Sequence, residues 1–190
     1  MGLLEAGIGE ELAGWLTEQP VFFVATAPLD EGGHVNCSPK GNRGEFAVID
    51  QEKVAYLDQS GSGIETIAHL RENGRITIMF CAFSGRPRIV RLQGRGEFIV
   101  RGDHRFDEFA KHFASEIGAG ARAVIVAHLD RIADSCGYGV PLMKFTKHRP
   151  ALDAWAEKEG VEGIVDYQQR KNLLSIDNLP GLDPLDNAIS

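Results

Sequence analysis

The chain contains 190 residues, of which 43% are hydrophobic and 25% are charged, and its formal net charge is −7. This length and composition suit one folded domain with a tail, or the compact subunit of a homodimer. The acidic balance argues against broad nucleic-acid binding, which needs clustered positive charge. It does not exclude a local basic pocket that holds one phosphate.

The first residues are acidic and lack the basic start and apolar core of a signal peptide. No apolar run approaches the roughly 20 residues needed to cross a bilayer. Cys37, Cys81 and Cys136 are odd in number and lack CxxC spacing, which disfavours a disulfide framework or a zinc knuckle. We therefore expect a cytoplasmic protein with no membrane or nucleic-acid partner and no metal.

Seven apolar or alternating runs, bounded by turn residues, are typical of β-strands. They cover residues 21–28, 34–41, 46–50, 53–58, 75–83, 88–100 and 122–137. Most are joined as hairpins and do not alternate with helices, which counts against a doubly wound parallel sheet. The pattern favours a closed or nearly closed antiparallel barrel of six or seven strands, because closure removes exposed strand edges.

Helical periodicity marks three segments among these strands. An amphipathic helix is expected over residues 5–18, a second from Ser62 to Gly74, and a third from Asp103 through Phe113. Asp103 is a residue type that can cap the third helix.

The composition changes after Pro150, where helical pieces and then turn-rich sequence follow. We expect one barrel domain over residues 1–148. A helical and turn-rich extension over 149–190 is expected to pack on the barrel or on a partner subunit.

The strand end at 36–41 is a candidate phosphate contact. Ser38 and Lys40 are two residues apart and therefore share one face of a strand, and Gly41 allows a close backbone approach. A lysine after a serine suits a phosphate, but a solvated edge-strand lysine accounts for it at least as well. Pro39 lacks an N–H group, which predicts an edge or irregular strand.

The helix start at Ser62 is a second candidate. Ser62 and Glu65 have the spacing of a capping box, and Gly61 precedes them. Amide groups and the dipole at a helix start favour an anion. The capping box would use one donor, and Glu65 would repel a phosphate unless it turns away, so an ordinary helix start remains an alternative.

Arg88, Arg91 and Gln93 form a third candidate, with Arg91 and Gln93 on one strand face. Arginine offers a donor fork for phosphate, and glutamine can pair with the edge of a heterocycle. An exposed face paired with carboxylates is the alternative. The loop that contains Cys136 and Tyr138 is expected to cover a ligand, with Tyr138 as a stacking or hydrogen-bonding group.

Three segments in this order resemble the pyridoxamine 5′-phosphate oxidase-like family, the flavin-binding split barrels. They are FVATAPLDEGGHVNCSPKG (23–41), VAYLDQSGSGIETIAHLRENGRITIMFCAF (54–83) and PRIVRLQGRGEFI (87–99). SCGYGVP (135–141) and KNLLSIDNLPGLD (171–183) resemble a bacterial subgroup of it. The resemblance implies a homodimer of six-stranded antiparallel split β-barrels that binds FMN in clefts between the subunits.

Carried over residue by residue, the resemblance implies a set of cofactor-binding positions on four segments. They are Ser38, Lys40 and Gly41 along the flavin, Tyr56, Leu57 and Asp58 beside its ring, Ser62 and Thr66 at the phosphate-binding helix start, and Arg88, Arg91 and Gln93 at the phosphate or flavin edge.

Two departures from the family pattern argue against true pyridoxamine phosphate oxidase activity. Residues 64–66 are Ile-Glu-Thr where such oxidases have an Arg-Lys pair, and the chain ends LDPLDNAIS instead of in a basic substrate motif. We expect an FMN-dependent oxidoreductase that acts on an unknown small molecule, with no catalytic residue assigned.

Three alternatives use the same fold. One is a reductase that depends on the deazaflavin F420, and a second is a non-catalytic flavin module. The third is a haem-binding module, which would need an axial ligand such as His34, His69 or His128.

Overall fold

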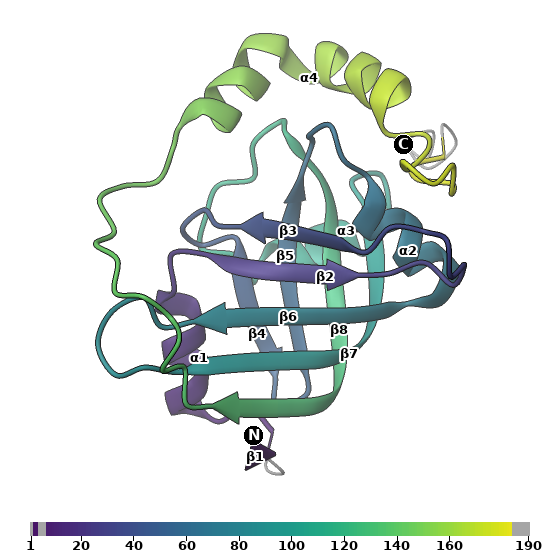
Figure 1. Ribbon diagram of the computed structural model, residues 1–190. Helices are drawn as coiled ribbons and strands as arrows, with labels where there is room; N and C mark the ends of the chain where they lie inside the picture. Colours follow the sequence, from purple (N-terminus) through teal and green to yellow (C-terminus); the bar gives the residue numbers. More distant parts are fainter. Residues whose placement is uncertain (1, 4–6, 184–190) are drawn as a thin grey trace.

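The computed structural model describes residues 2–3 and 7–183 and shows a mainly β structure with four helices in that part of the chain (Figure 1). The strands are β1 (Gly2–Leu3), β2 (Phe22–Thr26), β3 (Asn36–Lys40), β4 (Phe46–Asp50), β5 (Lys53–Gln59), β6 (Arg75–Cys81), β7 (Ile89–Val100) and β8 (Ala121–Ser135). The helices are α1 (Glu10–Glu18), α2 (Glu65–Asn73), α3 (Phe106–Ala110) and α4 (Ala151–Lys171).

All strand pairs are antiparallel, in the order β3-β2-β6-β7-β8-β5-β4, with β1 added beside β8. The mainly antiparallel β fold is therefore confirmed. The six-stranded barrel is wrong, because seven strands form the main path and its two end strands, β3 and β4, are not paired with each other within the described residues. The sheet coils but remains open.

The free edge of β3 follows from its sequence. Pro39 pairs with Phe23 of β2 and has no N–H group to offer a strand on the other side. Along β3 the even-numbered residues are half-buried and the odd-numbered ones are exposed. Ser38 and Lys40 therefore share the inward face, as predicted.

Two hydrophobic clusters lie on either side of β5. Val54 and Tyr56 belong to the cluster inside the coiled sheet, and Ala55 and Leu57 belong to a second cluster beneath α3. A strand covered on both faces is apolar throughout, which explains the run VAYL. The next residue, Asp58, is consequently placed at the buried end of the strand.

The helix boundaries differ from the sequence predictions. The structure begins α1 at Glu10; residues 5 and 6 of the predicted helix lie outside the described part. The capping box is wrong: α2 begins at Glu65, after an Ile64 cap, and no side chain caps it. Gly74 ends α2 in the left-handed conformation, with φ 69°, as the Asn-Gly pair predicted.

The third helix is shorter than predicted. It comprises five residues from Phe106, after an Arg105 cap that no side chain bonds. The Asp103 carboxylate instead accepts the backbone N–H of Arg105 at 2.8 Å.

The C-terminal extension lies over one end of the sheet. A connecting segment, residues 136–150, runs along the side of the molecule and leads into α4 (Figure 1). Gly160, with φ 65°, divides α4 into two helical pieces. Gln168 donates to the Ser60 hydroxyl at 2.8 Å, which fastens the second piece to the residue that follows β5.

Gly94 lies close to the β8 backbone at His128, at the point where the β7–β8 pairing shifts register between Gln93 and Gly94. A Cβ atom at this position would clash with the backbone carbonyl of His128. We expect Gly94→Ala to lower the free energy of unfolding by about 1–3 kcal/mol, because the backbone must move to admit it. Urea titration measures this, with Gly118→Ala as control, since no atom lies within 4 Å of a Cβ there. Equal losses in the two variants would contradict the prediction.

Candidate functional site

A cavity of ≈ 1330 Å³ opens beside the free edge of β3. Its walls come from β3, the turn at 41–46, the residues before and at the start of α2, and the connecting segment with the first turn of α4. The volume exceeds the 300–1,000 Å³ typical of small-molecule sites. The cavity can therefore hold a ligand of cofactor size.

The cavity wall is basic although the whole chain is acidic. The cationic residues that line it are Lys40, Arg43, Arg122, Lys144, Lys147 and Arg149, against the carboxylates Glu18, Glu45 and Glu65. A wall with this balance attracts an anion, although the chain as a whole has a net charge of −7.

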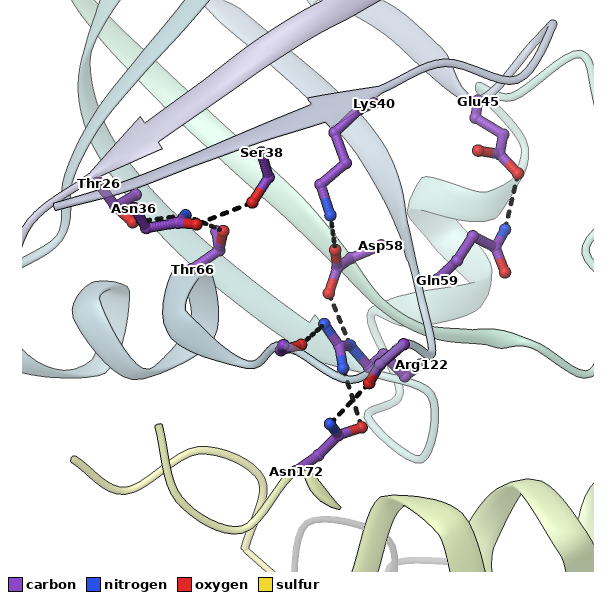
Figure 2. A network of polar contacts seen from close by, with 12 residues as sticks. Thr26, Asn36, Ser38, Lys40, Glu45, Asp58, Gln59, Thr66, Arg122 and Asn172 are labelled. Carbon is purple, nitrogen blue, oxygen red and sulfur yellow. Dashed lines mark hydrogen bonds and ion pairs between the residues drawn. The ribbon is translucent and has the colours of Figure 1, made fainter. Parts of the chain in front are cut away.

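One carboxylate holds two of these cations together (Figure 2). Asp58 is fully buried, and its two oxygens accept from Lys40 Nζ and Arg122 Nε, each at 2.7 Å. The Arg122 side chain is 4% exposed and that of Lys40 is 22% exposed. The cluster therefore carries one uncompensated positive charge beside the cavity.

The pKa of Asp58 reflects this arrangement. Burial alone would raise it, but the positive charges of Arg122 and Lys40 outweigh burial and lower the pKa to about 2. Asp58 is therefore ionised at neutral pH and cannot act as a proton donor.

Residues 60–63, the 60–63 loop, lead into α2 and line the cavity except at Ser62. Their carbonyl groups point to buried partners: Gly61 O accepts from Asn172 Nδ2 at 2.9 Å, and Gly63 O from Arg122 at 2.8 Å. A Cβ at Gly61 would meet open space. Because no side chain caps α2, its first N–H groups remain donors for a ligand.

Glu65 lines the cavity at the start of α2. One of its carboxylate oxygens accepts the Ile176 N–H at 3.3 Å. This contact engages part of its charge with the C-terminal extension. Thr66, one residue further, also lines the cavity.

A second polar network runs from Ser38 on β3 toward α2 (Figure 2). The Ser38 hydroxyl donates to Asn36 Oδ1 at 2.8 Å, and Asn36 Nδ2 reaches the hydroxyls of Thr66 at 3.1 Å and Thr26 at 3.2 Å. Thr26 is bonded in turn to His69 Nδ1 at 2.9 Å. This network ties β3 to the first turn of α2.

Two predicted residues on β5 lie close to the cavity. Leu57 lines it, whereas Tyr56 lies within the core, with the Lys40 ammonium 5.8 Å from its ring centroid. Burial, and then the Asp58 charge, raise the pKa of Tyr56 well above its ordinary value. Its hydroxyl has no hydrogen-bond partner among the described residues.

The structure gathers Ser38, Lys40, Gly41, Leu57 and Thr66 at the cavity and Asp58 directly behind it. It does not bring Ser62 or the β7 residues to this wall. Arg88 bonds Asp134 and lies over Trp15, Arg91 donates to Ser135 at 3.3 Å, and Gln93 accepts from Arg131 at 2.6 Å.

The remaining candidates also lie off the cavity wall. Cys136 and Tyr138 are exposed, and Tyr138 is not among the lining residues. His34 pairs with Asp177 at 2.6 Å, and His128 lies 3.3 Å from Glu97. The ring of His69 is enclosed by the polar network, where its Nε2 has no partner among the described residues.

Sequence reasoning missed three groups that shape the site. Arg122 opens the apolar run of β8, and a lone charge there was the available signal. Asn172 lies 50 residues from Arg122 in the sequence, and no local pattern marked it as a site residue. The third is Glu45, which accepts from Gln59 at 2.7 Å at the cavity wall, and burial raises its pKa.

The described residues contain neither a membrane-spanning helix nor a metal-binding cluster. No helix there is long and apolar enough to cross a membrane. Within the same residues, no three or more His, Cys, Asp or Glu side chains gather as they would around a metal ion.

We expect Asp58→Asn to lower the free energy of unfolding at pH 7 by about 3–5 kcal/mol, because it leaves the buried Arg122 and the half-buried Lys40 uncompensated. The pKa of Asp58 is depressed on folding, so its contribution is present above 3.8 and is lost as the pH falls through about 2. Urea titrations from pH 7 down to pH 2 should show the stability difference between parent and variant shrink below pH 3.8.

The control is Asp166→Asn, which removes an exposed pair with Arg170 and should change stability by less than about 1 kcal/mol. A stability difference for Asp58→Asn that is absent at pH 7, or constant across the range, would contradict the role assigned to its charge.

Comparison with known proteins identifies the same family that the sequence resembles. Residues 8–136 match the sequence profile of pyridoxamine 5′-phosphate oxidase. A relative from Aspergillus flavus, the pyridoxamine 5′-phosphate oxidase family protein ustO, is 42% identical over 196 residues, which cover 96% of this chain and 78% of the relative.

Among solved structures, HupZ of Group A Streptococcus superposes with a TM-score of 0.52 at 24% identity, covering 68% of this chain and 94% of HupZ. An FAD-binding protein of Mesorhizobium loti gives a TM-score of 0.48 at 17% identity, over 70% of this chain and 96% of that one. The HupZ similarity supports the fold alone. The profile match and the 42% identity show that this chain belongs to the pyridoxamine 5′-phosphate oxidase family.

Proposed function

We propose that the protein binds FMN in the cavity beside β3 and acts as a flavin-dependent oxidoreductase on a small molecule. The observation that carries the proposal is the Lys40–Asp58–Arg122 cluster, in which Asp58 and Arg122 are buried and whose excess positive charge adjoins the cavity. Buried charges are normally paired, so this excess favours an anion such as the FMN phosphate.

The residues present fit such a cofactor. Lys40 lines the cavity and can reach an anion there, while the first amide groups of α2 are free of side-chain caps. Gly61 leaves room for a close approach. Leu57 and Phe46 supply apolar wall for a flat ring system.

The flavin would supply the hydride or electron transfer, and the protein would bind and orient it. Lys40, together with Arg122 behind it, would hold the phosphate end. Glu45 could hold or release a proton at the cavity wall, since burial raises its pKa. No basic pair stands at 64–66, so the substrate need not be pyridoxamine phosphate.

We further propose that two copies of the chain form the complete site. Arg88, Arg91 and Gln93 do not line the cavity of their own chain, so they can reach a flavin only from a partner copy. Exposed apolar side chains on and after the connecting segment, such as Leu142 and Phe145, would give that copy a surface to cover.

The first test is the absorbance spectrum of the freshly purified protein, followed by mass spectrometry of the released ligand. The proposal predicts the flavin bands in the blue and a mass equal to that of FMN. A deazaflavin spectrum would show that F420 occupies the site, and a Soret band on haem addition would favour a haem module. A colourless protein that binds no FMN on titration would contradict the proposal.

We expect Lys40→Ala to weaken FMN binding by at least about tenfold, which corresponds to about 1.4 kcal/mol. Removal of this ammonium lowers the excess charge of the cluster to zero. The Kd from flavin-fluorescence titration measures the effect, with Lys53→Ala, on the same sheet but away from the cavity, as control. Unchanged affinity in Lys40→Ala would show that the phosphate lies elsewhere.

The dimer proposal predicts complementation between two weak variants. If Lys40 and a partner's Arg91 meet at one flavin, Lys40→Ala and Arg91→Ala each lose affinity by at least about tenfold. When the two variants are unfolded together and refolded, mixed dimers should contain one intact site and recover tight binding. A mixture that stays as weak as its components, or protein that is monomeric by light scattering, would contradict the shared site.

A further inference from the structure

Asn172 lies at the end of α4, far in sequence from the cavity, yet it is fully buried beneath the 60–63 loop. Both ends of its amide are engaged (Figure 2). Its Oδ1 accepts from Arg122 at 2.9 Å, and its Nδ2 donates to Gly61 O at 2.9 Å.

All three nitrogen atoms of the neighbouring Arg122 guanidinium group donate hydrogen bonds. Arg122 Nε bonds Asp58, one terminal nitrogen bonds Asn172, and the other donates to Gly63 O at 2.8 Å. Asn172 therefore fixes the loop twice, directly at Gly61 and through Arg122 at Gly63.

These contacts determine how the loop presents its amide groups. In a planar trans peptide the N–H points opposite to the C=O of the same unit. Holding Gly61 O and Gly63 O therefore fixes the orientation of the two peptide units that follow Gly61 and Gly63 of the cavity wall and lead into α2. Glycine at 61 and 63 gives this loop little stiffness of its own, so an external hold is required.

The rest of the extension strengthens the same attachment. Gln168 is buried and bonds the Ser60 hydroxyl, and the main chain of Asn172 pairs with Leu182. The extension thus bonds Ser60 and Gly61 directly and is linked to Gly63 through Arg122.

We infer that Asn172 is a positioning residue for phosphate binding, through which docking of the C-terminal extension and occupancy of the 60–63 loop are linked. The inference rests on the proposed binding of FMN. Asn172 does not itself touch the ligand: it orients the loop amides and keeps Arg122 in place. By linkage, each event must favour the other by the same factor.

Two substitutions separate positioning from packing. Asn172→Ala removes both hydrogen bonds. Asn172→Asp keeps the shape and can pair with Arg122, but it cancels the excess positive charge of the cluster and loses the donor to Gly61. A role in packing alone predicts that the aspartate variant is the milder one.

The experiment titrates apo protein with FMN and with riboflavin, which lacks the phosphate, and records thermal unfolding of each variant. We expect both Asn172 variants to bind FMN at least about tenfold more weakly, with Asn172→Asp the weaker, within the range of typical coupling factors. Riboflavin affinity should stay within about twofold of the parent. Gln169→Ala, an exposed neighbour on α4, should match the parent for both ligands.

A second measurement tests the linkage from the other side. FMN should slow hydrogen exchange in residues 164–182 of the parent, and riboflavin should not. In Asn172→Asp this protection by FMN should be lost. This variant keeps the side-chain shape, so the test can still be made if Asn172→Ala does not fold.

The outcomes separate this inference from the proposed function. A parent that binds FMN, with variants that bind it equally well or lose riboflavin in the same proportion, would overturn the positioning role alone. A parent that binds neither flavin would overturn the proposed function and this inference with it.

Discussion

The site depends on one carboxylate, Asp58, which lies between two cations at the buried end of β5. Two positive charges this close would repel each other without it, and their attraction outweighs the effect of burial on Asp58, whose pKa is lowered. Because one carboxylate compensates only one of the two cations, the cluster remains positive. A chain with an acidic surface thereby retains a local site for an anion.

The open edge of the sheet gives a ligand access to this charge. A closed barrel would pair β3 with another strand and fill the space that the cavity occupies. Pro39 prevents such pairing at one position, while β2 holds β3 from the other side. The C-terminal extension then covers the end of the sheet and supplies Asn172 beneath the 60–63 loop. The site is consequently assembled from segments at both ends of the sequence.

Local patterns predicted the strands and hairpins well, because alternating and apolar runs are determined by which faces are buried. The shared inward face of Ser38 and Lys40 and the end of α2 at Gly74 follow from such local rules. The capping box failed because Ser62 belongs to a loop before α2, whose carbonyls at Gly61 and Gly63 accept from the distant Asn172 and Arg122. The open path of the sheet depends on the pairing of distant strands, and the pairing of Asp58 with Arg122 spans 64 residues, which no local pattern contains. The placement of Arg88, Arg91 and Gln93 beside a flavin stays a prediction, since it requires a second copy of the chain.

The most direct measurement of the central claim is a crystal structure of the protein loaded with FMN. The account predicts phosphate oxygens within hydrogen-bonding distance of Lys40 Nζ and of the first amide groups of α2, with Asp58 still bonded to Arg122. A phosphate held instead by Lys144, Lys147 or Arg149 on the connecting segment, with solvent over the Asp58 cluster, would contradict it.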